Sequence, residues 1–142
     1  MTQMTDTAFA TKLAAMDLTS VIARVKDHTG MTDADIAKAE DLYRKFLQLA
    51  HHYRGKQRLV PPALADVIWD AHVTDTKKYM ADCYAVFGDM FHHDPSFYQT
   101  PEYTPAKRRT VDLYQQHYGY DLPALTRIES GEVPMGFCGG GQ

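Results

Sequence analysis

Apolar residues recur at helical spacing in four parts of the chain, which are residues 17–26, 32–55, 64–87 and 105–118. The second part has the clearest apolar stripe, formed by Ile36, Ala39, Tyr43, Phe46, Leu47 and Ala50. No part alternates apolar and polar residues as a half-buried strand does. The pattern therefore predicts an all-α fold, a compact bundle of about four helices.

Residues that begin or end helices flank these segments. Thr32 is a suitable N-cap, and Pro61-Pro62 suits the start of the third helix. Each segment is followed by a glycine that can stop it, and these are Gly30, Gly55, Gly88 and Gly119. Residues 91–98 are predicted to form an aromatic-rich loop, and the chain after Gly119 is predicted to be extended. We expect a single helical domain over residues 1–133 and a flexible tail over 134–142.

Composition narrows the classes of function. The 142 residues are 44% hydrophobic and 23% charged, which is typical of one globular domain. The net charge is −3 and the longest basic run is Lys107-Arg108-Arg109, so a nucleic-acid partner is not expected. No apolar stretch approaches the ~20 residues of a membrane span. The acidic N-terminus does not suit a signal peptide, and two cysteines make no disulfide framework, so we expect a cytoplasmic protein.

The third predicted helix carries the candidate chemistry. A helical wheel places seven residues on one face, namely Leu64, Ile68, His72, Asp75, Tyr79, Asp82 and Val86. The apolar members of this set indicate that the face points inward, where polar groups need partners. His72 and Asp75 are three residues apart, so their side chains can meet. The wheel places Asp66 and Asp70 on a different face, exposed to solvent, and Trp69 on the outer or flanking side.

Three interpretations of this face remain open. In the first, His72, Asp75 and Tyr79 form a buried structural network in a small helical binding or accessory protein, not an enzyme, whose partner is an unidentified protein or small ligand. In the second, His72 and Asp75 join His92 or His93 to bind Zn²⁺ or another first-row transition metal, with Cys138 as a further candidate ligand. In the third, His72 and Asp75 form a hydrolase dyad, for which the sequence shows no nucleophile. The pattern favours the first.

The same region resembles a known family, the glycine-rich domain-containing protein-like family. The resemblance is carried by Leu59-Val60-Pro61-Pro62, Asp66-Val67-Ile68-Trp69-Asp70-Ala71-His72, Asp75-Thr76, Tyr79, Asp82-Cys83, Phe87-Gly88 and His92-His93-Asp94-Pro95. The ending Cys138-Gly139-Gly140-Gly141 is similar to the tails of some bacterial relatives. The family commonly has a histidine directly after the tryptophan, where this chain has Asp70. The resemblance implies a site between residues 59 and 95 without assigning it an activity.

Overall fold

Helices alone make up the regular structure of residues 6–127, the part of the chain that the computed structural model describes. In order, they are α1 (Thr7–Ala15), α2 (Thr19–Thr29), α3 (Asp33–His52), α4 (Ala63–Thr74), α5 (Thr76–Phe87), the short 3-10 turn η1 (Phe97–Gln99), α6 (Tyr103–Tyr118) and α7 (Leu122–Leu125). No strand occurs within this range. The all-α prediction is confirmed, although the helices are more numerous than the four expected.

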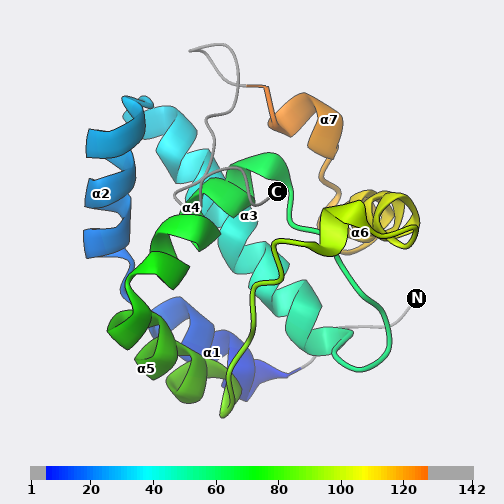
Figure 1. The fold of residues 1–142 in the computed structure, drawn as a ribbon, viewed down its shortest axis with the longest axis horizontal. Helices are drawn as coiled ribbons and strands as arrows, with labels where there is room; N and C mark the ends of the chain where they lie inside the picture. The colour runs from blue at the N-terminus through cyan, green and yellow to red at the C-terminus, as the bar shows by residue number, and fades with distance from the viewer. Residues whose placement is uncertain (1–5, 128–142) are drawn as a thin grey trace.

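Helix α4 lies in the middle of the structure and packs against α2, α3 and α5 (Figure 1). Every residue from Leu64 to His72 is buried. A helix that is buried around its whole circumference has no solvent-facing side for its polar residues. The helical wheel therefore gave a wrong result for three residues of α4, because Asp66, Trp69 and Asp70 are buried and not solvated or on the outside.

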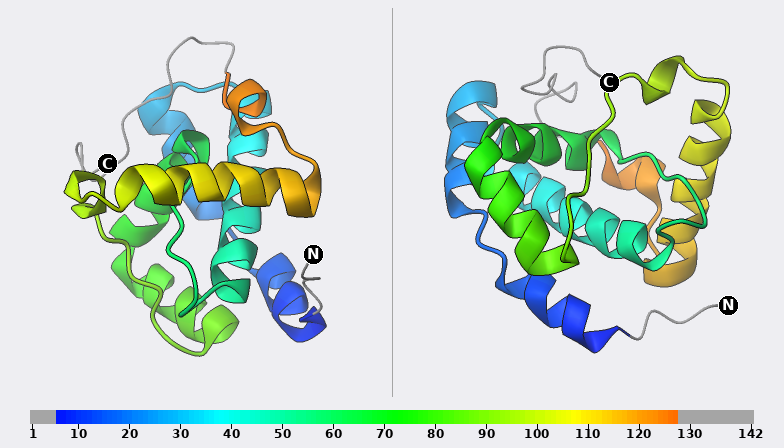
Figure 2. Two further views of the ribbon diagram at one scale, coloured as in Figure 1. Left: turned by 90° about the vertical axis from the view of Figure 1, so that its right-hand side faces the viewer. Right: turned by 60° about the horizontal axis from the view of Figure 1, so that its bottom comes forward.

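Helix α6 crosses the other helices at a large angle, being nearly end-on in Figure 1 and lengthwise in Figure 2. Tyrosine hydroxyls join it to α3. Tyr114 donates to the carbonyl oxygen of Leu42 at 2.6 Å, and Tyr118 donates to Oε1 of Gln48 at 2.8 Å. Tyr114 is fully buried, as its place on the predicted inner face of this helix indicates.

The predicted helix over residues 64–87 is two helices, which is a correction to the sequence analysis. The chain leaves helical geometry at Asp75, whose φ is −88° and ψ is 79°. The Asp75 carboxylate then accepts a hydrogen bond from the Lys78 amide and caps α5. Aspartate is a favoured N-cap because its side chain satisfies an amide that has no partner inside the helix. The break turns α5 away from α4 and lets it pack against α1.

Two further helices were not predicted. Helix α1 buries only Phe9 and Leu13, and so short an apolar stripe gives little periodic signal. Helix α7 is a single turn capped by Asp121, within a segment predicted to be extended. That prediction is wrong for Leu122–Leu125. The predicted tail over 134–142, with Cys138, lies outside the described residues.

The expected helix boundaries are otherwise close to those observed. Thr32 caps α3 by accepting a hydrogen bond from the Asp35 amide at 3.1 Å. Gly88 ends α5 with a φ of 74°, a left-handed conformation that glycine adopts without steric cost. Beyond it, residues 88–102 form the expected aromatic-rich connection, which contains only the short turn η1. None of the helices between residues 6 and 127 is both long and apolar enough to cross a bilayer.

The cap at Asp75 gives a testable prediction for the α4–α5 junction. Asp75→Ala should lower the free energy of unfolding by about 1 kcal/mol, because the Lys78 amide loses its acceptor. Asp75→Asn should change it by only a few tenths, because an asparagine oxygen caps almost as well. Urea unfolding followed by circular dichroism measures both values. Equal losses in the two variants would show that the carboxylate charge, and not the cap, matters at this position.

Candidate metal centre

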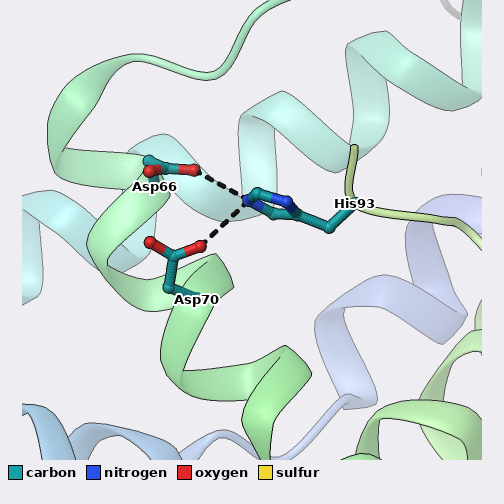
Figure 3. Close-up of side chains that lie close together, drawn as sticks. All are labelled: Asp66, Asp70 and His93. Carbon is teal, nitrogen blue, oxygen red and sulfur yellow. Dashed lines mark hydrogen bonds and ion pairs between the residues drawn. The ribbon is translucent and has the colours of Figure 1, made fainter. Parts of the chain in front are cut away.

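Two carboxylates of α4 and one histidine of the 88–102 connection form a buried cluster, which we call the Asp–Asp–His cluster (Figure 3). His93 Nε2 lies 3.2 Å from Asp66 Oδ1 and 2.9 Å from Asp70 Oδ1. The exposed fractions of the three side chains are 8%, 1% and 5% for Asp66, Asp70 and His93. A single atom, Nε2 of His93, thus lies close to both carboxylates.

The positions of the three side chains follow from local structure. Asp66 and Asp70 are four residues apart, so they project from the same side of α4 on successive turns. The imidazole of His93 packs against the ring of Trp69, with the ring centroids 4.3 Å apart. The connection that carries His93 is held nearby by Phe91, whose ring stacks on Trp69 at a centroid distance of 5.2 Å.

A hydrogen-bond chain holds the backbone of the same connection. The indole nitrogen of Trp69 donates to the hydroxyl oxygen of Tyr79 at 3.0 Å. The Tyr79 hydroxyl in turn donates to the carbonyl oxygen of Phe91. His93, two residues further on, is therefore placed by contacts that α4 and α5 make together.

The electrostatics of the cluster favour a proton shared with the carboxylates. Burial alone would lower the pKa of His93, but its hydrogen bonds to Asp66 and Asp70 outweigh burial and raise it to about 9. Burial also raises the pKa of Asp66 to about 6, assisted by the Asp70 carboxylate and opposed by His93. At neutral pH the imidazole is protonated and lies between two acceptors that would otherwise repel each other.

The same three side chains form a set of metal ligands. Each offers one ligand atom, and these atoms all lie within 4.8 Å of one another. A tetrahedral metal with bonds of about 2.0–2.1 Å separates its ligand atoms by roughly 3.3 Å. The two distances from His93 to the carboxylates, 2.9 and 3.2 Å, are a few tenths of an ångström shorter than this, and the ligand atoms of the two carboxylates lie within 4.8 Å of each other. A deprotonated His93 with the two carboxylates would leave further coordination positions open.

His72 belongs to a separate network. Burial lowers the pKa of its imidazole, so the ring is neutral. Its Nε2 lies 2.7 Å from Asp82 Oδ2, and its Nδ1 lies 2.8 Å from the Tyr43 hydroxyl. Because a carboxylate only accepts, Nε2 donates to Asp82 and Nδ1 accepts from Tyr43. His72 is 1% exposed and Tyr43 is fully buried, whereas Asp82 is 19% exposed and also pairs with Lys78, so the network reaches solvent at its carboxylate end.

The structure thus places the five predicted site residues in different surroundings. The ring of Tyr79 contacts that of His72, but its hydroxyl bonds to Trp69 and Phe91. His93 joins the Asp–Asp–His cluster, while His92 is exposed beside it. His72 bonds to Tyr43 and Asp82, and Asp75 caps α5. The predicted network and metal set are built on a contact between the His72 and Asp75 side chains, whereas the side-chain hydrogen bonds of the two residues go to different partners.

Two residues of the cluster, Asp66 and Asp70, were missed as site candidates. Their i, i+4 spacing is a signal for a shared face, but the wheel assigned that face to solvent.

A pocket of about 400 Å³ adjoins the cluster, and His93 is part of its wall. The pocket lies between the end of α3, residues 54–61 and the 88–102 connection. Aromatic side chains form much of its lining, namely Phe46, Trp69, Phe91, Phe97, Tyr98 and Tyr103. Arg54 and Arg58 also line it. Volumes of about 300–1,000 Å³ with a largely apolar lining are usual for small-molecule sites.

Comparisons with known proteins add no assignment to this geometry. The chain matches no family model, no curated protein and no solved structure.

The raised pKa of His93 predicts how the stability of the metal-free protein depends on pH. The folded protein holds this proton more tightly than the unfolded chain, so the stabilisation is full below pH 6.5 and is lost as pH rises through about 9. Allowing for solvent screening, we expect the free energy of unfolding to fall by about 2 kcal/mol over this range. Urea titrations at several pH values measure it. The dependence of the unfolding free energy on pH should vanish in His93→Gln and persist in His92→Gln. If it persists in both variants, the raised pKa does not belong to His93.

Proposed function

We propose that this is a metal-binding protein in which Asp66, Asp70 and His93 hold one divalent first-row transition metal ion. The observation that carries the proposal is the convergence of two carboxylates and one imidazole, all buried, on ligand atoms within 4.8 Å of one another. Carboxylate and imidazole suit Zn²⁺, Mn²⁺ and Fe²⁺. Of the ligands predicted from the sequence, His93 belongs to this centre, and Asp66 and Asp70 take the places predicted for His72 and Asp75.

Charge supports a divalent ion at this place. Asp66 and Asp70 together carry two negative charges when ionised, and buried charge is costly unless it is compensated. In the metal-free protein the protonated His93 supplies one compensating positive charge. A divalent ion would supply two and would release the histidine proton, so that the centre becomes neutral.

The surroundings of the cluster suit a metal centre that is open on one side. Two carboxylates and one imidazole occupy three positions, and the remainder are open to water or to a ligand, as in catalytic rather than structural metal sites. His93 is part of the pocket wall, so the open side would face the pocket. In such a site the ion would act as a Lewis acid or a ligand-binding group.

The family resemblance is consistent with this proposal. Where relatives commonly have a histidine after the tryptophan, this chain has Asp70, and Asp70 is a member of the cluster. Both residue types are metal ligands, so the position keeps a ligand atom through the change. We propose that the chain is a small member of the glycine-rich domain-containing protein-like family, with the centre between α4 and the paired histidines.

Metal titration of protein purified without a His-tag tests the proposal. Isothermal titration with Zn²⁺ and Mn²⁺ should show one equivalent bound by the wild type and by His92→Gln. Asp70→Asn and His93→Gln should each lose at least tenfold in affinity, because each removes a ligand atom. His92 is the matched control because it is the adjacent histidine and is exposed.

Folding is checked by circular dichroism for every variant. If His93→Gln does not fold, a histidine-selective NMR spectrum of the wild type is recorded instead. One equivalent of Zn²⁺ should shift the imidazole signals of His93 and leave those of His72 unchanged. A wild type that binds no metal, or that binds equally after the Asp70 and His93 substitutions, would contradict the proposal.

Proton competition gives a further prediction. Because the metal must displace the proton of His93, whose pKa is about 9, the apparent Zn²⁺ affinity should rise about tenfold per pH unit between pH 7 and 8.5. Titrations in two buffers of different ionisation enthalpy should also show close to one proton released per ion. An affinity that does not change over this range would indicate that His93 is not a ligand.

A further inference from the structure

The pocket beside the Asp–Asp–His cluster has the features of a site for a small organic molecule. Its inner wall is rigid, because Trp69 is buried and stacks on Phe91, and Phe46 packs at 5.2 Å from the Trp69 ring. Phe46, Trp69 and Phe91 make this part of the lining apolar and aromatic. The 88–102 connection provides the facing aromatic residues, among them Phe97 and Tyr98.

Two arginine side chains, those of Arg54 and Arg58, line the pocket, and each guanidinium lies over an aromatic ring, of which Phe97 belongs to the lining and Phe87 does not. The Arg58 guanidinium carbon lies 4.3 Å from the centroid of the Phe97 ring, and that of Arg54 lies 5.7 Å from the centroid of Phe87. Among the described residues, the hydrogen bonds of both guanidinium groups are made through Nη2 alone. Each group has five N–H donors, so donors remain for a ligand.

The ion pairs of these two arginines are weak competitors for a ligand. Arg54 pairs with Asp89 at 3.1 Å and Arg58 pairs with Asp94 at 3.2 Å. The two carboxylates are 67% and 44% exposed, and solvent-exposed ion pairs contribute little. The carboxylate of a ligand in the pocket could bind a guanidinium through two parallel hydrogen bonds, which is stronger than a contact through one.

The charge of the lining residues favours a negatively charged ligand. Arg54 and Arg58 are positive and Asp94 is the only acidic residue among the lining residues, so the lining carries a net positive charge when its histidines are neutral. Asp66 and Asp70 are not among the lining residues, and in the metal-free protein the protonated His93 offsets one of their two negative charges. An acidic ligand is thus favoured over a neutral or basic one of the same shape.

We propose that this pocket binds an aromatic carboxylic acid, with its ring against Trp69 and Phe91 and its carboxylate on Arg54 and Arg58. The pocket volume of about 400 Å³ accommodates one or two rings. The proposal uses the arginines and the aromatic wall only, and so does not depend on the metal.

The test uses 3-phenylpropanoate as the probe and metal-free protein, so that its result is independent of the metal titrations. The chain has one tryptophan, Trp69, so its indole N–H, which donates to Tyr79, gives a single signal in a ¹H–¹⁵N spectrum from a residue of the pocket wall. Titration should shift this signal in a saturable way. The neutral 3-phenylpropanamide should bind at least tenfold more weakly, and inorganic phosphate should not shift the signal.

Charge-matched double variants complete the test. Arg54→Gln with Arg58→Gln should lower the affinity for 3-phenylpropanoate at least tenfold and leave the amide unaffected. Lys56→Gln with Arg108→Gln removes the same charge from exposed residues outside the pocket and should bind as the wild type does. No shift of the indole signal, equal binding of acid and amide, a response to phosphate alone, or equal losses in the two double variants would each overturn the proposal.

Discussion

The burial of α4 around its whole circumference is the constraint on which the rest of the structure depends. Apolar residues satisfy this constraint without partners, because burying them on any side of the helix is favourable in free energy. The three ionisable residues of α4, which are Asp66, Asp70 and His72, do need partners, since a buried ionisable group must be paired or neutralised. Their partners come from outside α4, so burial of this helix fixes where α3, α5 and the 88–102 connection have to lie.

Two histidines illustrate how differently the same side chain behaves in these surroundings. His72 has one carboxylate partner and one hydroxyl partner, and burial lowers its pKa, so it serves as a neutral bridge within the core. His93 has two carboxylate partners, which raise its pKa above the ordinary value. In the first arrangement each ring nitrogen has one hydrogen-bond partner. In the second, two carboxylates converge on one imidazole nitrogen, and a metal ion could replace the proton there.

The 88–102 connection joins the chemistry to the pocket. It has almost no regular secondary structure, so its path is set by side-chain contacts to Trp69 and Tyr79. Those contacts place His93 on the cluster and the aromatic residues that follow on the pocket wall. A metal centre and a ligand pocket that share this wall would be coupled, because movement of the connection would disturb both.

The sequence by itself determined the all-helical fold, the cap at Thr32, the stop at Gly88 and the region that holds the chemistry, because these depend on neighbouring residues along the chain. It did not determine which carboxylates meet which histidine. A helical wheel assumes one buried face, whereas α4 is buried on all sides, and the wheel ran through a helix that breaks at Asp75. Only the tertiary structure, through the path of residues 88–102, brought His93 to Asp66 and Asp70 and left His72 with Tyr43 and Asp82.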